Sequence, residues 1–108
     1  MVTVIVDAEN VRRSLWPNIA ARELVELVRA WAEEAGVQPL VVFDGAAPVE
    51  AADVVGTGEE SADDWIAREA PSLVPYWLVT SDRELRERVA GAAERVVGGG
   101  TFARQLRR

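Results

Sequence analysis

Short apolar runs alternate along the chain with longer stretches of mixed polarity, and this order indicates an α/β fold. Mostly apolar, β-branched or aromatic residues fill positions 2–6, 40–43 and 76–79. Runs of this length and composition are typical of strands that are buried on both faces of a sheet. In the stretches between them, apolar side chains recur every three or four positions, which predicts amphipathic helices.

Three helices are predicted, over about residues 20–35, from residue 61 to just before Pro71, and over about residues 82–90. The first ends at Gly36, because glycine readily adopts the left-handed conformation that follows many helices. A strand, a helix and a second strand of these lengths form a right-handed βαβ unit with parallel strands.

The remaining segments are shorter or less regular. Residues 11–18 are predicted to form a polar loop, and residues 45–60 an irregular segment with a short extended piece at 54–55. A fourth short strand at 96–97 and a small closing helix over 102–106 complete the chain. All 108 residues together predict one α/β domain of three layers, with a small, mostly parallel central sheet and helices on both faces.

The composition restricts the chemistry that the chain supports. It contains no cysteine, no histidine and no lysine, and all 12 of its basic residues are arginines. These absences exclude zinc fingers, thiol nucleophiles, histidine-based triads, Walker-type phosphate binding and lysine-dependent receiver-type phosphoacceptor sites. The net charge of −6 argues against broad electrostatic attraction to nucleic acid. Aspartates gathered in one pocket would account for part of that charge, and a bound divalent cation would invert the local field.

Each of the three main predicted strands ends at or just before an aspartate, namely Asp7, Asp44 and Asp82. A fourth acidic point, Asp63 and Asp64, opens a predicted helix. Because the carboxyl ends of parallel strands lie at one edge of a sheet, these side chains are expected to converge in one pocket. Clustered carboxylates repel one another, and such oxygen ligands bind Mg²⁺ or Mn²⁺. The pattern therefore predicts a carboxylate site able to hydrolyse a phosphodiester bond with divalent ions.

Helix capping is the alternative explanation for some of these acids. The segments from Ser61 to Asp64 and from Ser81 to Glu84 both fit the Ser-x-x-acid pattern of a capping box. In the first segment Asp64 is the better capping partner, which leaves Asp63 freer to act as a ligand. An acidic residue in the first helical turn also interacts favourably with the helix dipole.

Capping does not account for the acids at the ends of the first two strands. Asp7 has no such explanation, whereas Asp44 precedes Gly45 and is a weaker additional candidate because Asp-Gly commonly forms a turn. Asn10 either orients Asp7, contacts substrate through its amide, or forms an Asx turn that ends the strand. Glu9 is expected to point away from the site because of strand alternation.

Four sequence blocks together resemble a known family. They are Val-Asp-Ala-Glu-Asn-Val at 6–11, Val-Phe-Asp-Gly at 42–45, Ser-Ala-Asp-Asp-Trp-Ile at 61–66 and Val-Thr-Ser-Asp-Arg-Glu-Leu at 79–85. Their order and approximate spacing are similar to those of NYN domains of the YacP-like group, which belong to the PIN-like nucleases. No single block is specific, but the four in order span nearly the whole chain. The resemblance implies a three-layer PIN-like α/β fold and a Mg²⁺- or Mn²⁺-dependent ribonuclease.

The resemblance also implies roles for individual residues. The implied catalytic residues are Asp7, Asn10, Asp63 and Asp82. The implied metal ligands share a carboxylate group, and they are Asp7, Asp63, Asp64 and Asp82. Arg86 stands where some relatives carry a further aspartate, so the resemblance supplies no ligand for a second metal ion at that position.

RNA binding requires phosphate contacts and is strengthened by base stacking. Candidate substrate-binding residues lie beside the aspartates in the sequence, and they are Arg12, Arg13, Ser81 and Arg83. For each arginine the alternative is a solvated surface side chain, as it is for the basic tail over 104–108. Trp16 either stacks on a base or, as is commoner for a tryptophan before a proline, packs its loop onto the core.

Further expectations concern the alternative function, the location and the partners. The acidic surface and Arg86 favour, as the alternative, a PIN-like module that binds RNA or protein with little or no catalysis. No apolar stretch approaches the roughly 20 residues that span a bilayer, and the opening run is too short for a signal peptide. A cytoplasmic protein without a membrane partner is therefore expected. Because one strand edge is expected to be exposed and basic residues are few, a homodimer that binds RNA along a surface shared by both copies is a further possibility.

Overall fold

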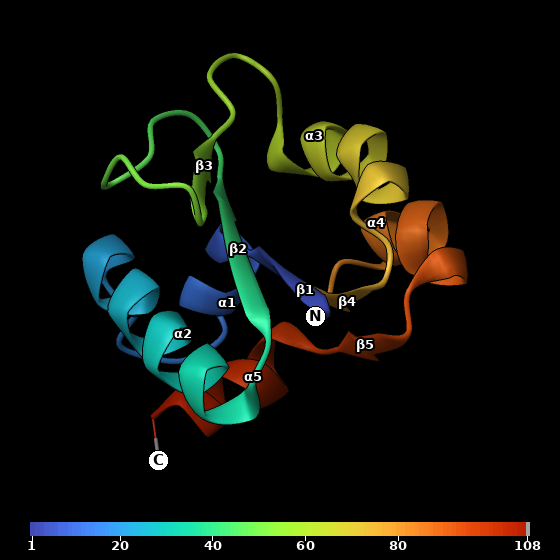
Figure 1. The fold of residues 1–108 in the computed structure, drawn as a ribbon. Coiled ribbons are helices and arrows are strands. Elements are labelled where there is room, and N and C mark those ends of the chain that lie inside the picture. Colours follow the sequence, from blue (N-terminus) through green and yellow to red (C-terminus); the bar gives the residue numbers. More distant parts are fainter. Residues whose placement is uncertain (108) are drawn as a thin grey trace.

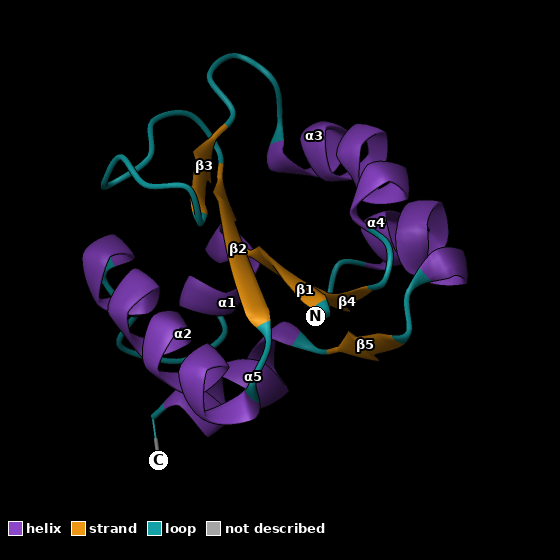
Figure 2. Cartoon of the chain, viewed as in Figure 1, coloured by secondary structure: helices purple, strands orange, loops and turns teal. Residues whose placement is uncertain are grey.

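A parallel sheet of five strands forms the centre of the computed structural model, which describes residues 1–107 (Figures 1 and 2). Residue 108, the last of the predicted basic tail, lies outside the described residues. The strands, in chain order, are β1 (Thr3–Asp7), β2 (Gln38–Phe43), β3 (Val54–Gly56), β4 (Tyr76–Val79) and β5 (Arg95–Val97). Their order across the sheet is β3-β2-β1-β4-β5, and all four neighbouring pairs are parallel.

Helices cover both faces of this sheet. They are α1 (Ala8–Arg12), α2 (Ala21–Ala35), α3 (Ala62–Glu69), α4 (Arg83–Val89) and α5 (Gly99–Leu106), with 3₁₀ turns η1 (Ala70–Leu73) and η2 (Ala90–Ala92). Figure 1 shows α1, α2 and α5 on one face and α3 and α4 on the other. The predicted three-layer α/β architecture is therefore confirmed. None of the helices within residues 1–107 combines the length and the apolarity needed to cross a bilayer.

Alternation along β1 directs its side chains into two cores. Val4 and Val6 pack with α1, α2 and α5, whereas Ile5 packs with α3 and α4. All three side chains are completely buried. This burial on both sides of the sheet explains why the first strand appears in the sequence as an almost continuous apolar run.

The order of the strands creates a crevice beside β1. The chain runs from β1 outward to β2 and β3, and then returns to the other side of β1 for β4 and β5. The direction of winding thus reverses between β1 and β4. In open parallel sheets, ligands bind beyond the carboxyl ends of the strands at such a switch point. Asp7 at the end of β1 and residues 80–82 after β4 lie there.

The predicted polar loop over residues 11–18 begins two residues later than expected, after a short helix that was not predicted. Residues 8–12 form the short helix α1, because Ala8 and Val11 lie three positions apart and both are completely buried against the core. The prediction that Trp16 packs its loop onto the core is also wrong, since its side chain is 91% exposed. Leu15 packs against the core instead.

Candidate functional site

Asp7 is the most buried acid at the carboxyl edge of the sheet. It is only 5% exposed, and its Oδ2 accepts a hydrogen bond of 2.8 Å from the Thr80 hydroxyl. Burial raises the pKa of Asp7 to about 6 against the opposing effect of that hydrogen bond, and the charges of Asp63 and Asp44 raise the pKa further. The Thr80 hydroxyl also accepts from the Asp82 N–H at 3.1 Å, so it connects two of the predicted ligands.

Asp63 faces the same region from the first turn of α3. Burial raises the pKa of the Asp63 carboxyl, and the charges of Asp82 and Asp44 raise it further, while Arg88 lowers it. Within residues 1–107 its carboxylate makes no hydrogen bond and no ion pair. The charges of Asp63 and Asp44 act on Asp7, and those of Asp82 and Asp44 act on Asp63, so the four aspartates share one electrostatic neighbourhood. Asp7 and Asp82 line one pocket, as predicted, whereas Asp44 and Asp63 are not among its lining residues.

Asp44 and Asp82 cap helices as well as belonging to this neighbourhood. Asp44 Oδ1 accepts from the Ala62 N–H at 2.7 Å, at the start of α3. The expectation that capping does not account for Asp44 is therefore wrong, because Asp44 binds a helix start 18 residues further along the chain. Asp82 Oδ1 accepts from the Leu85 N–H at 2.9 Å, at the start of α4. Each cap occupies one carboxylate oxygen, so capping and metal binding are compatible. The caps also fix both helix starts against the strand ends.

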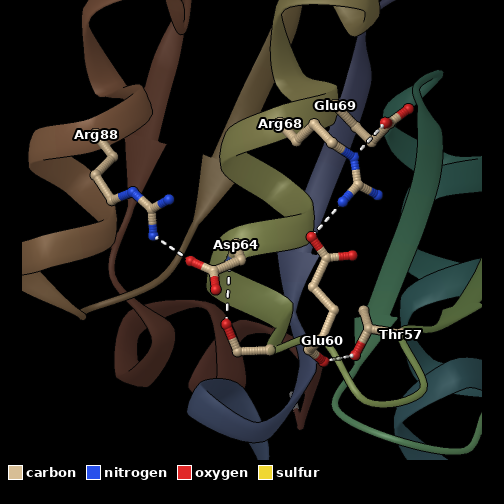
Figure 3. Close-up of polar contacts among 7 residues, drawn as sticks. Thr57, Glu60, Asp64, Arg68, Glu69 and Arg88 are labelled. Carbon is tan, nitrogen blue, oxygen red and sulfur yellow. Dashed lines mark hydrogen bonds and ion pairs between the residues drawn. The ribbon is translucent and has the colours of Figure 1, made fainter.

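Asp64, unlike its neighbour Asp63, pairs with an arginine. Its carboxylate lies 2.9 Å from the Arg88 guanidinium on α4 and is 59% exposed (Figure 3). Its backbone N–H donates to the Ser61 hydroxyl at 3.1 Å, which confirms Ser61 as the helix cap. The structure thus separates the paired acids that open α3, with Asp63 in the acidic neighbourhood and Asp64 bound to an arginine.

Asn10 and Ser81 connect three elements beside the aspartates. Asn10 Oδ1 accepts from the Ser81 N–H at 2.9 Å, and the Ser81 hydroxyl accepts from the Gly99 N–H at 2.8 Å. A Cβ atom on Gly99 would overlap the Asn10 side chain, so this approach requires glycine. The prediction that Ser81 caps the following helix is wrong, because Asp82 is the cap and the Ser81 hydroxyl binds α5 instead.

A pocket of about 340 Å³ opens beside Asp7. Its lining residues are Asp7, Glu9, Asn10, Arg13, Ser14 and Asp82. The expectation that Glu9 points away is wrong, because residue 9 lies in a helix and strand alternation does not apply to it. Amphipathic spacing of Ala8 and Val11 in the sequence is the signal that identifies this helix.

The four predicted substrate-binding residues occupy different environments. Arg12 donates from Nε to the Ile19 carbonyl at 2.8 Å and pairs with Glu9 at 2.7 Å, so it holds the loop together. Arg13 lines the pocket and is 72% exposed, at 3.4 Å from Glu9. Arg83 is exposed at the start of α4, and Ser81 takes part in the link to α5.

The donor set fits Mg²⁺ or Mn²⁺ chemically. No three acidic side chains in the described part of the chain are close enough, as they stand, to hold an ion together. Mg²⁺ nevertheless commonly binds through one or two carboxylates and keeps several water molecules. Burial, and to a smaller extent the charges of neighbouring acids, raise the pKa of Asp7 and of Asp63, and a cation between such carboxylates would favour their charged forms.

Comparison with known proteins identifies a structural likeness. No family model and no curated protein matches the sequence. A crystal structure of Rae1 (YacP) from Bacillus subtilis, determined for a tryptophan-to-leucine mutant, matches with a TM-score of 0.76 at 23% sequence identity. The match covers 99% of this chain and 76% of that chain. At this identity the likeness shows the fold alone, and it agrees with the predicted PIN-like α/β fold.

Proposed function

We propose that the chain is a Mg²⁺- or Mn²⁺-dependent ribonuclease of the YacP-like NYN group, with its site at the carboxyl edge of the sheet. The observation that carries this proposal is the buried carboxylate of Asp7, which lies beside an open pocket and is repelled by Asp63 and Asp44. Burying acids together without a counter-charge is unfavourable for folding, and such arrangements are concentrated at functional sites. The sequence resemblance supports RNA as the substrate.

Each residue of the site has a role in this proposal. Asp7, Asp63 and Asp82 would hold the metal ion, which when bound would activate water and stabilise the leaving oxygen of the phosphodiester. Asn10 would position the pocket wall through its hydrogen bond to the Ser81 N–H. The exposed guanidinium of Arg13 would bind a phosphate of the substrate.

Cleavage of RNA by matched variants tests the proposal. Structured and single-stranded RNA would be incubated with Mn²⁺ and the wild type, Asp63→Asn or Asp82→Asn. Asparagine keeps the helix cap at position 82, so that substitution changes mainly the charge. Each variant is expected to lower the cleavage rate at least about 100-fold, because several kcal/mol of transition-state stabilisation would be lost.

The matched control is Asp53→Asn. Asp53 is also a half-buried aspartate, but it pairs with Arg29 and lies just before β3, at the opposite end of the strands from the site. Its substitution is expected to leave cleavage unchanged. Wild-type cleavage that survives both Asp63→Asn and Asp82→Asn would contradict the proposed site.

A binding module without catalysis is the second candidate, and Arg86 favours it. Arg86 Nε donates to the Thr80 carbonyl at 2.8 Å, so a fixed positive charge lies directly behind the residue that binds Asp7. A cation near the carboxylates competes electrostatically with a metal ion. RNA affinity without cleavage in Mn²⁺ or Mg²⁺ would establish this second function instead.

A further inference from the structure

Trp16 is an exposed aromatic side chain that the fold does not use. Its ring is 91% exposed, more than that of any other large hydrophobic residue within residues 1–107. Trp31, Trp65 and Trp77, in contrast, pack against the two cores. Leaving an indole in water forgoes the hydrophobic stabilisation that its burial would give. Folding therefore does not explain a tryptophan at this position.

The loop that carries Trp16 is fixed at its base. The Ile19 N–H donates to the Arg12 carbonyl at 3.2 Å, and Arg12 Nε donates back to the Ile19 carbonyl at 2.8 Å. Ile19 is completely buried, and Leu15 packs against the core from inside the loop. The backbone on both sides of the ring is thus held in place, which lowers the entropy lost when a ligand stacks on it.

The backbone that carries the ring lies next to the proposed substrate pocket. Arg13 and Ser14, which line the pocket, precede Trp16 by three and two residues. Two residues of chain span at most about 7 Å, so the Trp16 backbone lies close to the pocket rim. Exposed arginines and exposed aromatic rings on one surface are the combination with which proteins hold the backbone and the bases of a single strand, and Arg13 and Trp16 are such a pair three residues apart.

The charge of the protein makes such a local contact important. Its net charge of −6 gives little general attraction for a polyanion. Affinity for RNA must therefore depend on contacts such as stacking, which are insensitive to net charge. Stacking on a protein ring needs an unpaired base, because a paired base is already stacked within its duplex.

We propose that Trp16 is a stacking platform for one unpaired base of an RNA strand whose phosphate binds Arg13. This inference rests on the proposed function for its substrate class, and it adds a subsite that selects single-stranded over double-stranded RNA at the pocket rim. The stacking surface is the exposed indole face, and the neighbouring guanidinium neutralises the backbone.

Binding measurements on single-stranded and duplex RNA of the same sequence test the proposal. Ca²⁺ would replace Mn²⁺, and a denaturing gel would verify that the RNA stays intact. Trp16→Ala is expected to weaken binding of the single strand about tenfold, within the range for loss of one base stack. Trp16→Phe is expected to keep affinity within about threefold, because a smaller ring still stacks. Duplex affinity is expected to stay unchanged in both variants.

Two controls make the result specific. Val74→Ala removes apolar surface from another exposed residue, just before β4 and therefore at the opposite edge of the sheet, and is expected to change neither affinity. Single-stranded RNA is expected to quench the indole fluorescence of the wild type and to leave that of Trp16→Phe largely unquenched. Equal loss of single-strand and duplex binding in Trp16→Ala would overturn the proposal.

Other outcomes also decide the matter. An unchanged single-strand affinity in Trp16→Ala, or a dimer in sedimentation that this variant alone abolishes, would assign the ring to another partner and overturn the stacking role. If the wild type does not cleave RNA but Trp16→Ala still weakens single-strand binding alone, the ribonuclease proposal is rejected and the stacking subsite is retained. If the wild type cleaves RNA but Trp16→Ala does not weaken single-strand binding selectively, only the stacking subsite is rejected.

Discussion

Two sets of acidic residues in this molecule have opposite electrostatic surroundings. The paired acids, defined here as Asp53, Glu60, Asp64 and Glu69, each bind an arginine. The sheet-edge aspartates, defined as Asp7, Asp44, Asp63 and Asp82, make no ion pair within residues 1–107. The guanidinium of Arg29 lowers the pKa of Asp53, whereas burial and mutual repulsion raise the pKa of Asp7 and Asp63.

The difference in pairing between the two sets shows that unpaired, destabilising carboxylates are retained at the carboxyl edge of the sheet. Figure 3 shows Arg68 between Glu60 and Glu69, and Arg88 facing Asp64. Exposed pairs of this kind contribute little to stability. A buried, unpaired carboxylate such as Asp7 is destabilising, and active sites commonly retain such groups because function requires them. The chain has arginines available, yet those that pair with acids do not pair with the sheet-edge aspartates.

Replacing Asp7 gives the largest expected effect, and it acts in two directions. Asp7→Asn is expected to lower RNA cleavage at least about 100-fold, because the buried ligand is lost. The same variant is expected to raise the free energy of unfolding at pH 8, since the buried charge is removed and asparagine still accepts from Thr80. Cleavage assays and urea unfolding of the two proteins measure the two effects. A variant that lost both activity and stability would contradict this explanation.

The pH dependence of unfolding gives the next largest effect. The folded-state pKa of Asp7 is raised to about 6, so its charged form opposes folding above that pH. The penalty is absent below the ordinary aspartate pKa near 4, grows between about pH 4 and 6, and is complete above pH 6. Two pKa units correspond to about 3 kcal/mol. Urea unfolding without metal at several pH values should show a higher free energy of unfolding for Asp7→Asn than for the wild type above pH 6. This difference should vanish near pH 4.

Disrupting a paired acid is expected to have a smaller effect of opposite sign. Asp53→Asn weakens the double hydrogen bond to Arg29, whose distances are 2.8 and 2.9 Å. We expect the melting temperature to fall by about 4 °C, the change typical of a partly exposed ion pair in a chain of this size. A thermal scan checks this, and an increase in stability would erase the distinction between the two sets of acids.

The smallest effect is expected at Asp64. Asp64→Asn removes an exposed partner of Arg88, so the melting temperature should change by less than about 2 °C. The freed guanidinium, which already lowers the pKa of Asp63, would move closer to that residue. Cleavage should therefore fall, but by no more than about threefold. A loss as large as that of Asp63→Asn would show that Asp64 is a metal ligand, as the sequence resemblance implies.

The sequence predicted the sheet edge well because strand ends are local features. Apolar runs located β1, β2 and β4, and parallel pairing then placed Asp7, Asp44 and Asp82 along one edge. The helix start after Ser61 was equally readable, since capping depends on residues three positions apart. These features follow from short-range patterns and from the geometry of a parallel sheet.

Other features depended on contacts between distant segments. The sequence does not reveal that Arg12 would bind the Ile19 carbonyl, that Ser81 would bind α5, or that Arg88 would separate Asp64 from Asp63. The exposure of Trp16 likewise depends on how its loop closes. The metal ion, the homodimer and the cytoplasmic location stay predictions.

Calorimetric titration of Mn²⁺ at pH 8 tests most directly whether the sheet-edge aspartates form a metal site. Saturable binding is expected for the wild type and for Asp53→Asn. Asp7→Asn is expected to lose that binding, because removing a buried ligand removes both charge and coordination. Absence of wild-type binding at millimolar Mn²⁺, or equal binding by Asp7→Asn, would contradict it.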